Sequence, residues 1–254
     1  MEALHQWYEQ VLKHIRENGL KNLSEYETEN GQNPFQKFTD VTRSKDSLKP
    51  FSYSDFKHGD EFNFLSMDLI YIISILVYII SILELLHPHI NNSIKENGTY
   101  HQTVEDHLYL RYAGFGFQII YSYWDRIGDI LALFFKTGLI GDVYLGRVFS
   151  NFPKEFRSDT YVELLILYKS EVEHVLADRH GVVHSFGLKA KHFWGIIGEQ
   201  NQSEREELQN EKDRYPKVFR RQLENFFQGF TLAMKLISEL PDKEPPTPIS
   251  LEKE

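Results

Sequence analysis

The sequence predicts an all-α protein, an antiparallel bundle of four long helices with additional short helices attached. Apolar residues recur at helical spacing over long stretches, and turn residues and helix caps separate these stretches. No run of four to eight residues alternates convincingly between apolar and polar positions, so no strand is expected. The 254 residues are 41% hydrophobic, which is enough for one substantial core. We find no internal repeat and no second core.

Residues 1–60 are predicted to form an N-terminal helix followed by an irregular arm. The helix spans residues 2–17 and ends at Gly19. Residues 20–60 are polar and show no sustained period, which is typical of a long loop. The apolar stripe of the helix consists of Leu4, Trp7, Val11 and Ile15.

The predicted helical bundle covers residues 61–240 and begins with an apolar helix over residues 62–86, which His87-Pro88 ends. Within it, residues 69–83 contain no charge. A membrane-spanning helix needs about 20 apolar residues. These 15 are therefore better explained as the central helix of a helical domain, with a membrane anchor as the alternative.

The other helices of the bundle are bounded by capping patterns and by proline. Thr103 to Asp106 forms a capping box that opens a long aromatic helix, and Pro216 suits the first turn of the last helix. Residues 241–254 have the composition of a disordered tail. Three further helices are expected. One covers residues 142–150, the second begins with a cap at Thr160 and reaches about residue 178, and the third covers residues 188–199. The stripe of the last helix is Phe219, Leu223, Phe226, Phe230 and Ile237.

Charge and cysteine content limit the class of protein. The formal charge of −9 argues against a general nucleic-acid coat protein but not against a local basic site. The chain has no cysteine, which excludes disulfides and thiolate metal sites and fits a reducing compartment. The N-terminal residues do not resemble a signal peptide. We therefore expect a cytoplasmic protein.

The segment ADRHGVVHSF interrupts the helical pattern and brings one arginine close to two histidines. Arg179 continues the apolar stripe of the preceding helix, seven residues after Val172. Gly181 and the valines that follow it disfavour further helix. We therefore expect the chain to turn here and to place His184 beside Arg179, with His180 between them.

An arginine next to a histidine suits a phosphodiester. The guanidinium makes paired hydrogen bonds to phosphate oxygens, and the imidazole can take or give a proton at neutral pH. No acidic residue occurs between positions 179 and 192, and Lys189, Lys191 and His192 extend this cationic window as candidate RNA-binding residues. The spacing alone also fits an arginine that caps a helix end and a histidine on the surface.

Arg179 to His184 has the form R-[N/D/H]-x-x-x-H in an all-helical chain, which resembles the HEPN superfamily. The resemblance covers roughly residues 62–240 and includes YWDRIGDILALFF at residues 123–135. It implies a metal-independent endoribonuclease, often a toxin of a toxin–antitoxin or phage-defence system, with Arg179 and His184 as catalytic pair and His180 as the variable polar position. It further implies a homodimer with two motifs in one composite cleft, RNA as the substrate and an antitoxin protein as a further candidate partner.

Two carboxylates on the aromatic helix are candidate supporting residues. Asp125 and Asp129 continue a polar line through Gln118 and Ser122. Either carboxylate can orient Arg179 or His184 as the third group of a catalytic site. The alternative is a solvent-facing stripe with Arg126 alongside.

No metal and no cofactor is expected. His180 and His184 are spaced four apart, but glycine and valines lie between them and no HExxH-type carboxylate accompanies them. Gly114 and Gly116 are expected to let helices approach closely rather than to bind phosphate. A basic group at the last helix fits either an RNA backbone or a solvated face balanced by nearby glutamates. This group is Arg214, Lys217, Arg220 and Arg221.

The sequence therefore supports a ribonuclease that attacks RNA through its 2′-OH. The products would be a 2′,3′-cyclic phosphate and a 5′-OH. His184 would act as general base or general acid, and Arg179 would hold the scissile phosphate. The alternative is a non-catalytic helical module that binds a nucleotide or a partner protein.

Overall fold

The structure, a computed structural model, is mostly helical, as the sequence predicts. It describes residues 2–28, 30–36, 59–93, 103–135, 143–175 and 202–240, and these contain no β-strand. Three expected features lie outside the described residues. They are the helix over residues 188–199, the end of the aromatic helix after residue 136 and the tail of residues 241–254.

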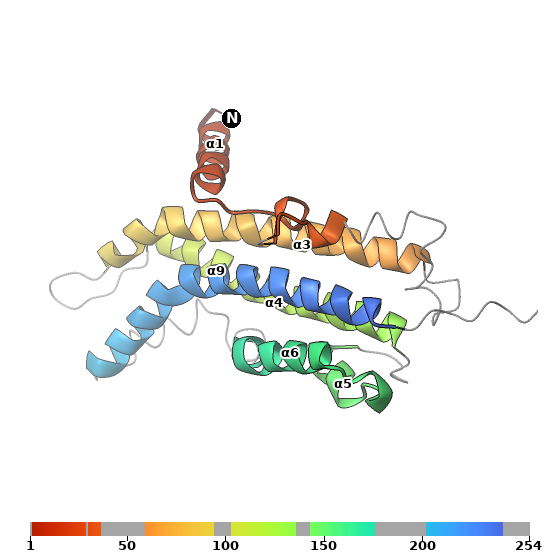
Figure 1. Cartoon of the computed structure of the whole chain (residues 1–254). Coiled ribbons are helices and arrows are strands. Elements are labelled where there is room, and N and C mark those ends of the chain that lie inside the picture. The colour runs from red at the N-terminus through yellow and green to blue at the C-terminus, as the bar shows by residue number, and fades with distance from the viewer. Residues whose placement is uncertain are drawn as a thin grey trace, which may run out of the picture.

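Three long helices and one shorter helix run side by side (Figure 1). Helix α3 (Gly59–Leu86) lies against α4 (Val104–Phe134) and α9 (Gln202–Ser238), and α6 (Asp159–Leu167) lies against α9. In Figure 1, α3 and α6 run in one direction, and α4 and α9 run in the opposite direction. The short helix α5 (Leu145–Ser150) packs on α4.

The N-terminal helix projects from this layer, and the residues after it return to the core. Helix α1 (Glu2–Glu17) has the predicted bounds, and Gly19 follows it with a φ of +61°. A short 3₁₀ turn, η1 (Leu23–Glu25), then carries Leu23 into the core. Downstream, the ring of Tyr26 stacks on Phe227 of α9 at 4.2 Å between ring centroids. Part of the arm is therefore packed against the long helices.

Helix α3 is apolar on nearly every side and provides the centre of the core, as predicted. It ends where a 3₁₀ turn, η4 (His87–Ser93), begins with His87-Pro88. The stretch Phe64–Ile90 is long and apolar enough to cross a membrane by length and composition. However, 61% of its most apolar window is buried inside the protein, as in the core helix of a helical domain.

The predicted capping box at the start of α4 is present and is connected to a buried ion pair. Thr103 accepts from the backbone N–H of Asp106, and the Asp106 carboxylate accepts from the backbone N–H of Thr103. The same carboxylate pairs with Lys212 of α9, and neither side chain is exposed to solvent. Lys212 also donates to the carbonyl of Ile90 at 3.3 Å. This network ties α4, η4 and α9 together.

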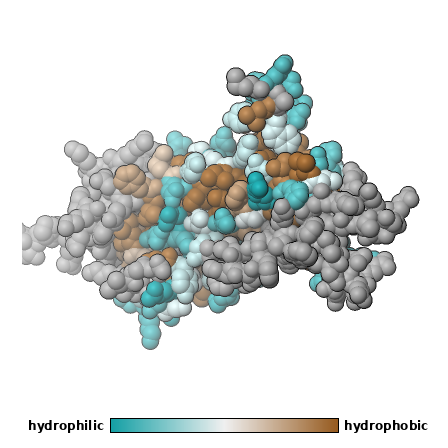
Figure 2. Space-filling view, turned by 180° about the vertical axis from the view of Figure 1, so that it is seen from behind, coloured by the Kyte–Doolittle hydropathy of each residue, from teal (hydrophilic) through white to brown (hydrophobic). Residues whose placement is uncertain are grey.

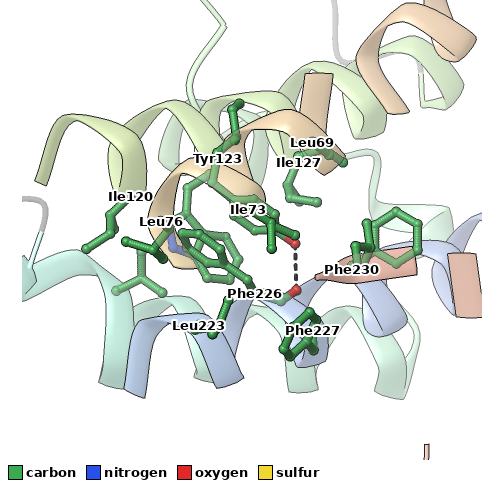
Figure 3. Packing of buried hydrophobic residues seen from close by; sticks show 14 of the residues in the cluster. Leu69, Ile73, Leu76, Ile120, Tyr123, Ile127, Leu223, Phe226, Phe227 and Phe230 are labelled. Carbon is green, nitrogen blue, oxygen red and sulfur yellow. Dashed lines mark hydrogen bonds between the residues drawn. The ribbon is translucent and has the colours of Figure 1, made fainter. Parts of the chain in front are cut away.

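Aromatic rings fill the space between α4 and α9 (Figure 3). Tyr123 stacks on Phe226 at 3.7 Å between centroids, and its hydroxyl donates to the Phe226 carbonyl at 2.5 Å. A Cβ at Gly116 would lie only 2.4 Å from the ring of Phe219, which confirms that this glycine permits close helix approach. Every residue of the stripe predicted for the last helix is buried.

Two predicted helix starts are wrong. Pro216 lies inside α9, because the helix begins at Gln202 rather than near the proline. A proline inside a helix costs about 3 kcal/mol, but Tyr215 before it and Phe219 after it are both buried, so α9 packs on the core on both sides of Pro216. The cap of α6 is Ser158, whose hydroxyl accepts from Tyr161 N, and Thr160 lies within the helix.

Candidate functional site

The predicted catalytic and RNA-binding residues lie outside the described residues. The described chain reaches Val175 on one side of them and resumes at Gln202, the first residue of α9. The structure therefore describes the helices that precede and follow the motif. The undescribed predicted residues are Arg179, His180, His184, Lys189, Lys191 and His192.

The helix before the motif buries the predicted stripe and contains an unpredicted π-helical turn. Val172 is fully buried and Val175 nearly so, as the spacing requires. Between α6 and Val175 lies η6, a π-helix over Tyr168–Val172. Single π-helical turns are rare and are frequent at functional sites. Gln222 of α9 donates to the carbonyl of Glu171 at 2.7 Å and so stabilises this turn.

The two candidate supporting carboxylates take different roles. Asp129 accepts from Arg126 Nη1 at 2.7 Å, and Arg126 Nε donates to Asp68 of α3 at 2.5 Å. Burial raises the pKa of Asp129 above its ordinary value, and Arg126 opposes that effect only in part. Asp129 is thus part of an ion-pair network between α4 and α3. Arg126 lies alongside Asp129, as in the alternative interpretation, but Asp129 is half-buried rather than simply solvent-facing, because Arg126 also pairs with Asp68 of α3.

Asp125 lies on the side of α4 that faces Tyr168 of η6. Burial, which is the largest cause, and the negative charges of Glu173 and Asp125 together raise the pKa of Tyr168 to about 12. The Tyr144 and Tyr121 hydroxyls contribute in the same direction. We call Tyr121, Asp125, Tyr144 and Tyr168 the tyrosine–carboxylate cluster.

Small residues allow the elements of this cluster to approach one another. A Cβ at Gly146 would lie 2.7 Å from the Tyr168 hydroxyl, and one at Gly128 would lie 3.0 Å from the backbone nitrogen of Leu145. The first contact seats η6 on α5, and the second seats α5 on α4. Tyr144, at the start of α5, is about half exposed. The cluster therefore joins three elements and is partly open to solvent.

The chemistry of the cluster suits a cationic group. Its carboxylate and phenol oxygens can accept hydrogen bonds, and the negative charge of Asp125 attracts a cation. A guanidinium or imidazolium would be oriented there, whereas a phosphate would need a cation to accompany it. Among the described residues, no group of three or more metal-ligating side chains is present.

The basic residues of α9 are partly engaged in ion pairs. Arg220 pairs with Glu84 of α3, and Arg221 pairs with Glu171 of η6 at 3.2 Å and with Glu224 at 3.3 Å. Arg221 lowers the pKa of Glu171. The other two basic residues, Arg214 and Lys217, are exposed.

Sequence reasoning missed Tyr168, Tyr144 and Gln222. Tyr168 lies four residues before Val172, at a position of the apolar stripe that Arg179 continues, so its spacing gives no sign of a polar role. Tyr144 lies in the short helix expected over residues 142–150, where no pattern marks it as a site residue. Gln222 was visible only as a polar residue within an aromatic stripe, which is the one local signal that a buried partner exists.

Comparison with known proteins yields no match. No protein-family model, no curated protein and no solved structure is similar enough to this chain to be recognised. The functional argument therefore depends on the chain itself.

Proposed function

We propose that this protein is a HEPN-like, metal-independent endoribonuclease that works as a cytoplasmic homodimer. The observation that carries the proposal is the R-x4-H motif, Arg179 to His184, in a segment bounded by described helices on both sides. Support comes from the preceding helix, whose buried face at Val172 and Val175 has the phase assumed for Arg179. Further support comes from the tyrosine–carboxylate cluster, whose acidic groups suit a guanidinium or an imidazolium.

The fold that belongs to this proposal is an antiparallel bundle of four long helices. Its members are α3, α4, α6 extended by η6, and α9. The alternating directions of these helices in Figure 1 support this arrangement, and so do the contacts of α9 with each of the others. In such a bundle, the motif connects the third helix to the fourth.

In the proposed reaction, the 2′-oxygen of one nucleotide attacks the adjacent phosphorus, and the bond from that phosphorus to the 5′-oxygen of the next nucleotide breaks. One proton leaves the 2′-OH as its oxygen attacks, and one proton reaches the departing 5′-oxygen. His184 performs one of these two proton transfers. Arg179 binds the non-bridging oxygens and stabilises the charge that develops on them, and His180 assists in positioning. The products are a 2′,3′-cyclic phosphate and a 5′-OH.

Asp125 is the carboxylate that we assign to orienting this pair. Asp125 belongs to the tyrosine–carboxylate cluster together with Tyr168. Tyr168 precedes Arg179 by eleven residues in the chain. Asp129 is engaged with Arg126 and takes a structural role. Lys189, Lys191 and His192 would guide the RNA backbone by charge. A toxin or phage-defence effector with a protein antitoxin is the biological setting that we propose.

Two observations favour the non-catalytic alternative. The net charge of −9 opposes the approach of a polyanion, and so does the carboxylate of the tyrosine–carboxylate cluster. A module that binds a nucleotide or a partner protein would keep the motif for geometry alone.

Cleavage of labelled RNA in EDTA separates the two functions. The wild-type chain is compared with His184→Ala, Arg179→Ala and the control His174→Ala, an exposed histidine ten residues earlier. We expect cleavage by wild type and control, and a loss of at least about 100-fold in both motif variants. Growth arrest on expression in bacteria is measured in parallel. The proposal fails if the wild type neither cuts RNA nor arrests growth, or if His184→Ala does both equally well.

A further inference from the structure

Helix α3 presents large apolar side chains to solvent along one line. Phe64, Met67 and Tyr71 are 75%, 64% and 65% exposed. A helix on the outside of a monomeric protein normally carries polar residues on its outer face. Here that line has Asp68 at its edge, and Asp68 is paired with Arg126 of α4.

Helices α4 and α1 extend this apolar line into a surface. Helix α3 packs on both α4 and α1, and on α4 the ring of Tyr112 lies 6.5 Å from that of Phe115 between ring centroids. Figure 2 shows hydrophobic side chains gathered in a band across the molecule below the projecting helix. We call this the aromatic surface; its exposed members are Tyr8, Phe64, Met67, Tyr71, Leu108 and Phe115.

We propose that a second copy of this chain covers the aromatic surface through a two-fold symmetric contact. The inference names the surface of the homodimer proposed above, but it does not depend on ribonuclease activity. Six large side chains, each exposed by about a third to three quarters, offer on the order of 650 Å² of apolar area. A standard interface buries about 800 Å² per partner, of which somewhat more than half is apolar. The available area therefore meets what a stable dimer needs.

Charges at the two ends of the surface are complementary under a two-fold axis. Arg111 of α4 is exposed near one end, whereas Asp68, Arg126 and Asp129 form a network with excess negative charge near the other. Eighteen residues of helix, about 27 Å, separate Arg111 from Asp129. A two-fold axis through the middle of the surface places the arginine of each copy opposite the acidic network of the other.

A lipid surface fits these observations less well. The chain carries a net charge of −9, which opposes binding to anionic headgroups. Salt bridges on both sides of the apolar stretch of α3, at Asp68 and Glu84, would also have to leave water.

The test is the oligomeric state of the full chain in solution. We expect light scattering coupled to size exclusion to give twice the 30.0 kDa mass of one chain. Tyr71→Glu and Phe115→Glu should each raise the dimer dissociation constant by about 30-fold or more, since each buries a charge at the centre. Arg111→Glu should weaken the dimer less and remove part of its salt dependence. Ile166→Glu on α6, at a residue 60% exposed outside the surface, is the matched control and should remain dimeric.

Circular dichroism and thermal melting show whether each variant is folded, so that loss of the dimer is not confused with loss of structure. A folded wild type that is monomeric at all accessible concentrations overturns the inference. So does a dimer that both central variants leave intact, or a monomer that binds vesicles of phosphatidylcholine. RNA cleavage is scored separately: a dimer without cleavage leaves this inference standing and removes the proposed function.

Discussion

Replacing Lys212 by methionine removes the ammonium group that pairs with Asp106 in the buried network described above. Neither side chain is exposed to solvent, so water cannot take over the role of the ammonium group. Breaking one partner of a buried ion pair costs roughly 3–5 kcal/mol, because the remaining charge stays buried. For a protein of this size, that corresponds to a fall in Tm of about 10 °C.

Urea unfolding followed by circular dichroism measures this effect. The double variant Asp106→Asn with Lys212→Met is the control, because asparagine keeps the helix cap and leaves no unpaired charge. It should recover at least half of the stability lost in Lys212→Met. The reasoning is refuted if Lys212→Met costs less than about 1 kcal/mol, or if the two substitutions add.

Three further predictions concern a glycine, a pH dependence and the site. Gly116→Ala should cost about 1–3 kcal/mol of unfolding free energy, because its methyl group meets a ring of α9, whereas Gly114→Ala, with nothing within 4 Å, should be neutral or stabilising. Burial alone would raise the pKa of Glu84, but hydrogen bonds from Arg220 and His14 outweigh it and hold the pKa below its ordinary 4.5. The stabilisation of about 1–3 kcal/mol that Glu84 provides should therefore be present above that pH and lost on acidification. In the RNA assay, Asp125→Asn should reduce cleavage about 10- to 100-fold, by analogy with the loss of an orienting group.

Each of these predictions has a clear contrary result. Equal stabilities of the two glycine variants in urea would contradict the close approach of α4 and α9. The stability difference between wild type and Glu84→Gln should shrink from pH 7 to pH 3, and a constant difference would contradict the ion pair. Asp129→Asn should lower the free energy of unfolding more than Asp125→Asn does, whereas Asp125→Asn should lower the rate of RNA cleavage more. The opposite result would mean that the two carboxylates have exchanged roles.

Features with short-range causes could be predicted from the sequence. The end of α1 follows from Gly19, although Leu4 of its expected apolar stripe is 73% exposed. The cap of α4 follows from Thr103 and Asp106, three residues apart. The buried face of α9 follows from aromatic spacing alone. In each case the residues responsible lie close together in one helix, or they recur along the sequence at the helical spacing.

Features that depend on distant partners could not be predicted. Lys212 pairs with a carboxylate 106 residues away, and no local pattern distinguishes it from a solvated lysine. The π-helical turn receives a hydrogen bond from Gln222, 51 residues beyond Glu171. Tertiary packing also decides whether α9 continues through Pro216, where local preference indicates a start.

The candidate site shows the same division. Asp125 and Asp129 lie on one line of α4 by helical phase, which the sequence predicts correctly. One helix turn separates them, yet one faces the cluster around Tyr168 and the other faces Arg126 and α3. Spacing places two side chains on one face of a helix, but only the neighbouring helices determine what each contacts.

The chemistry of the RNA ends produced in EDTA tests the central claim most directly. If Arg179 and His184 direct the 2′-oxygen onto phosphorus, wild-type protein must leave 2′,3′-cyclic phosphate and 5′-OH ends that His184→Ala does not. Fragments with 3′-OH and 5′-phosphate ends, or cyclic phosphate ends from both proteins alike, would contradict the account.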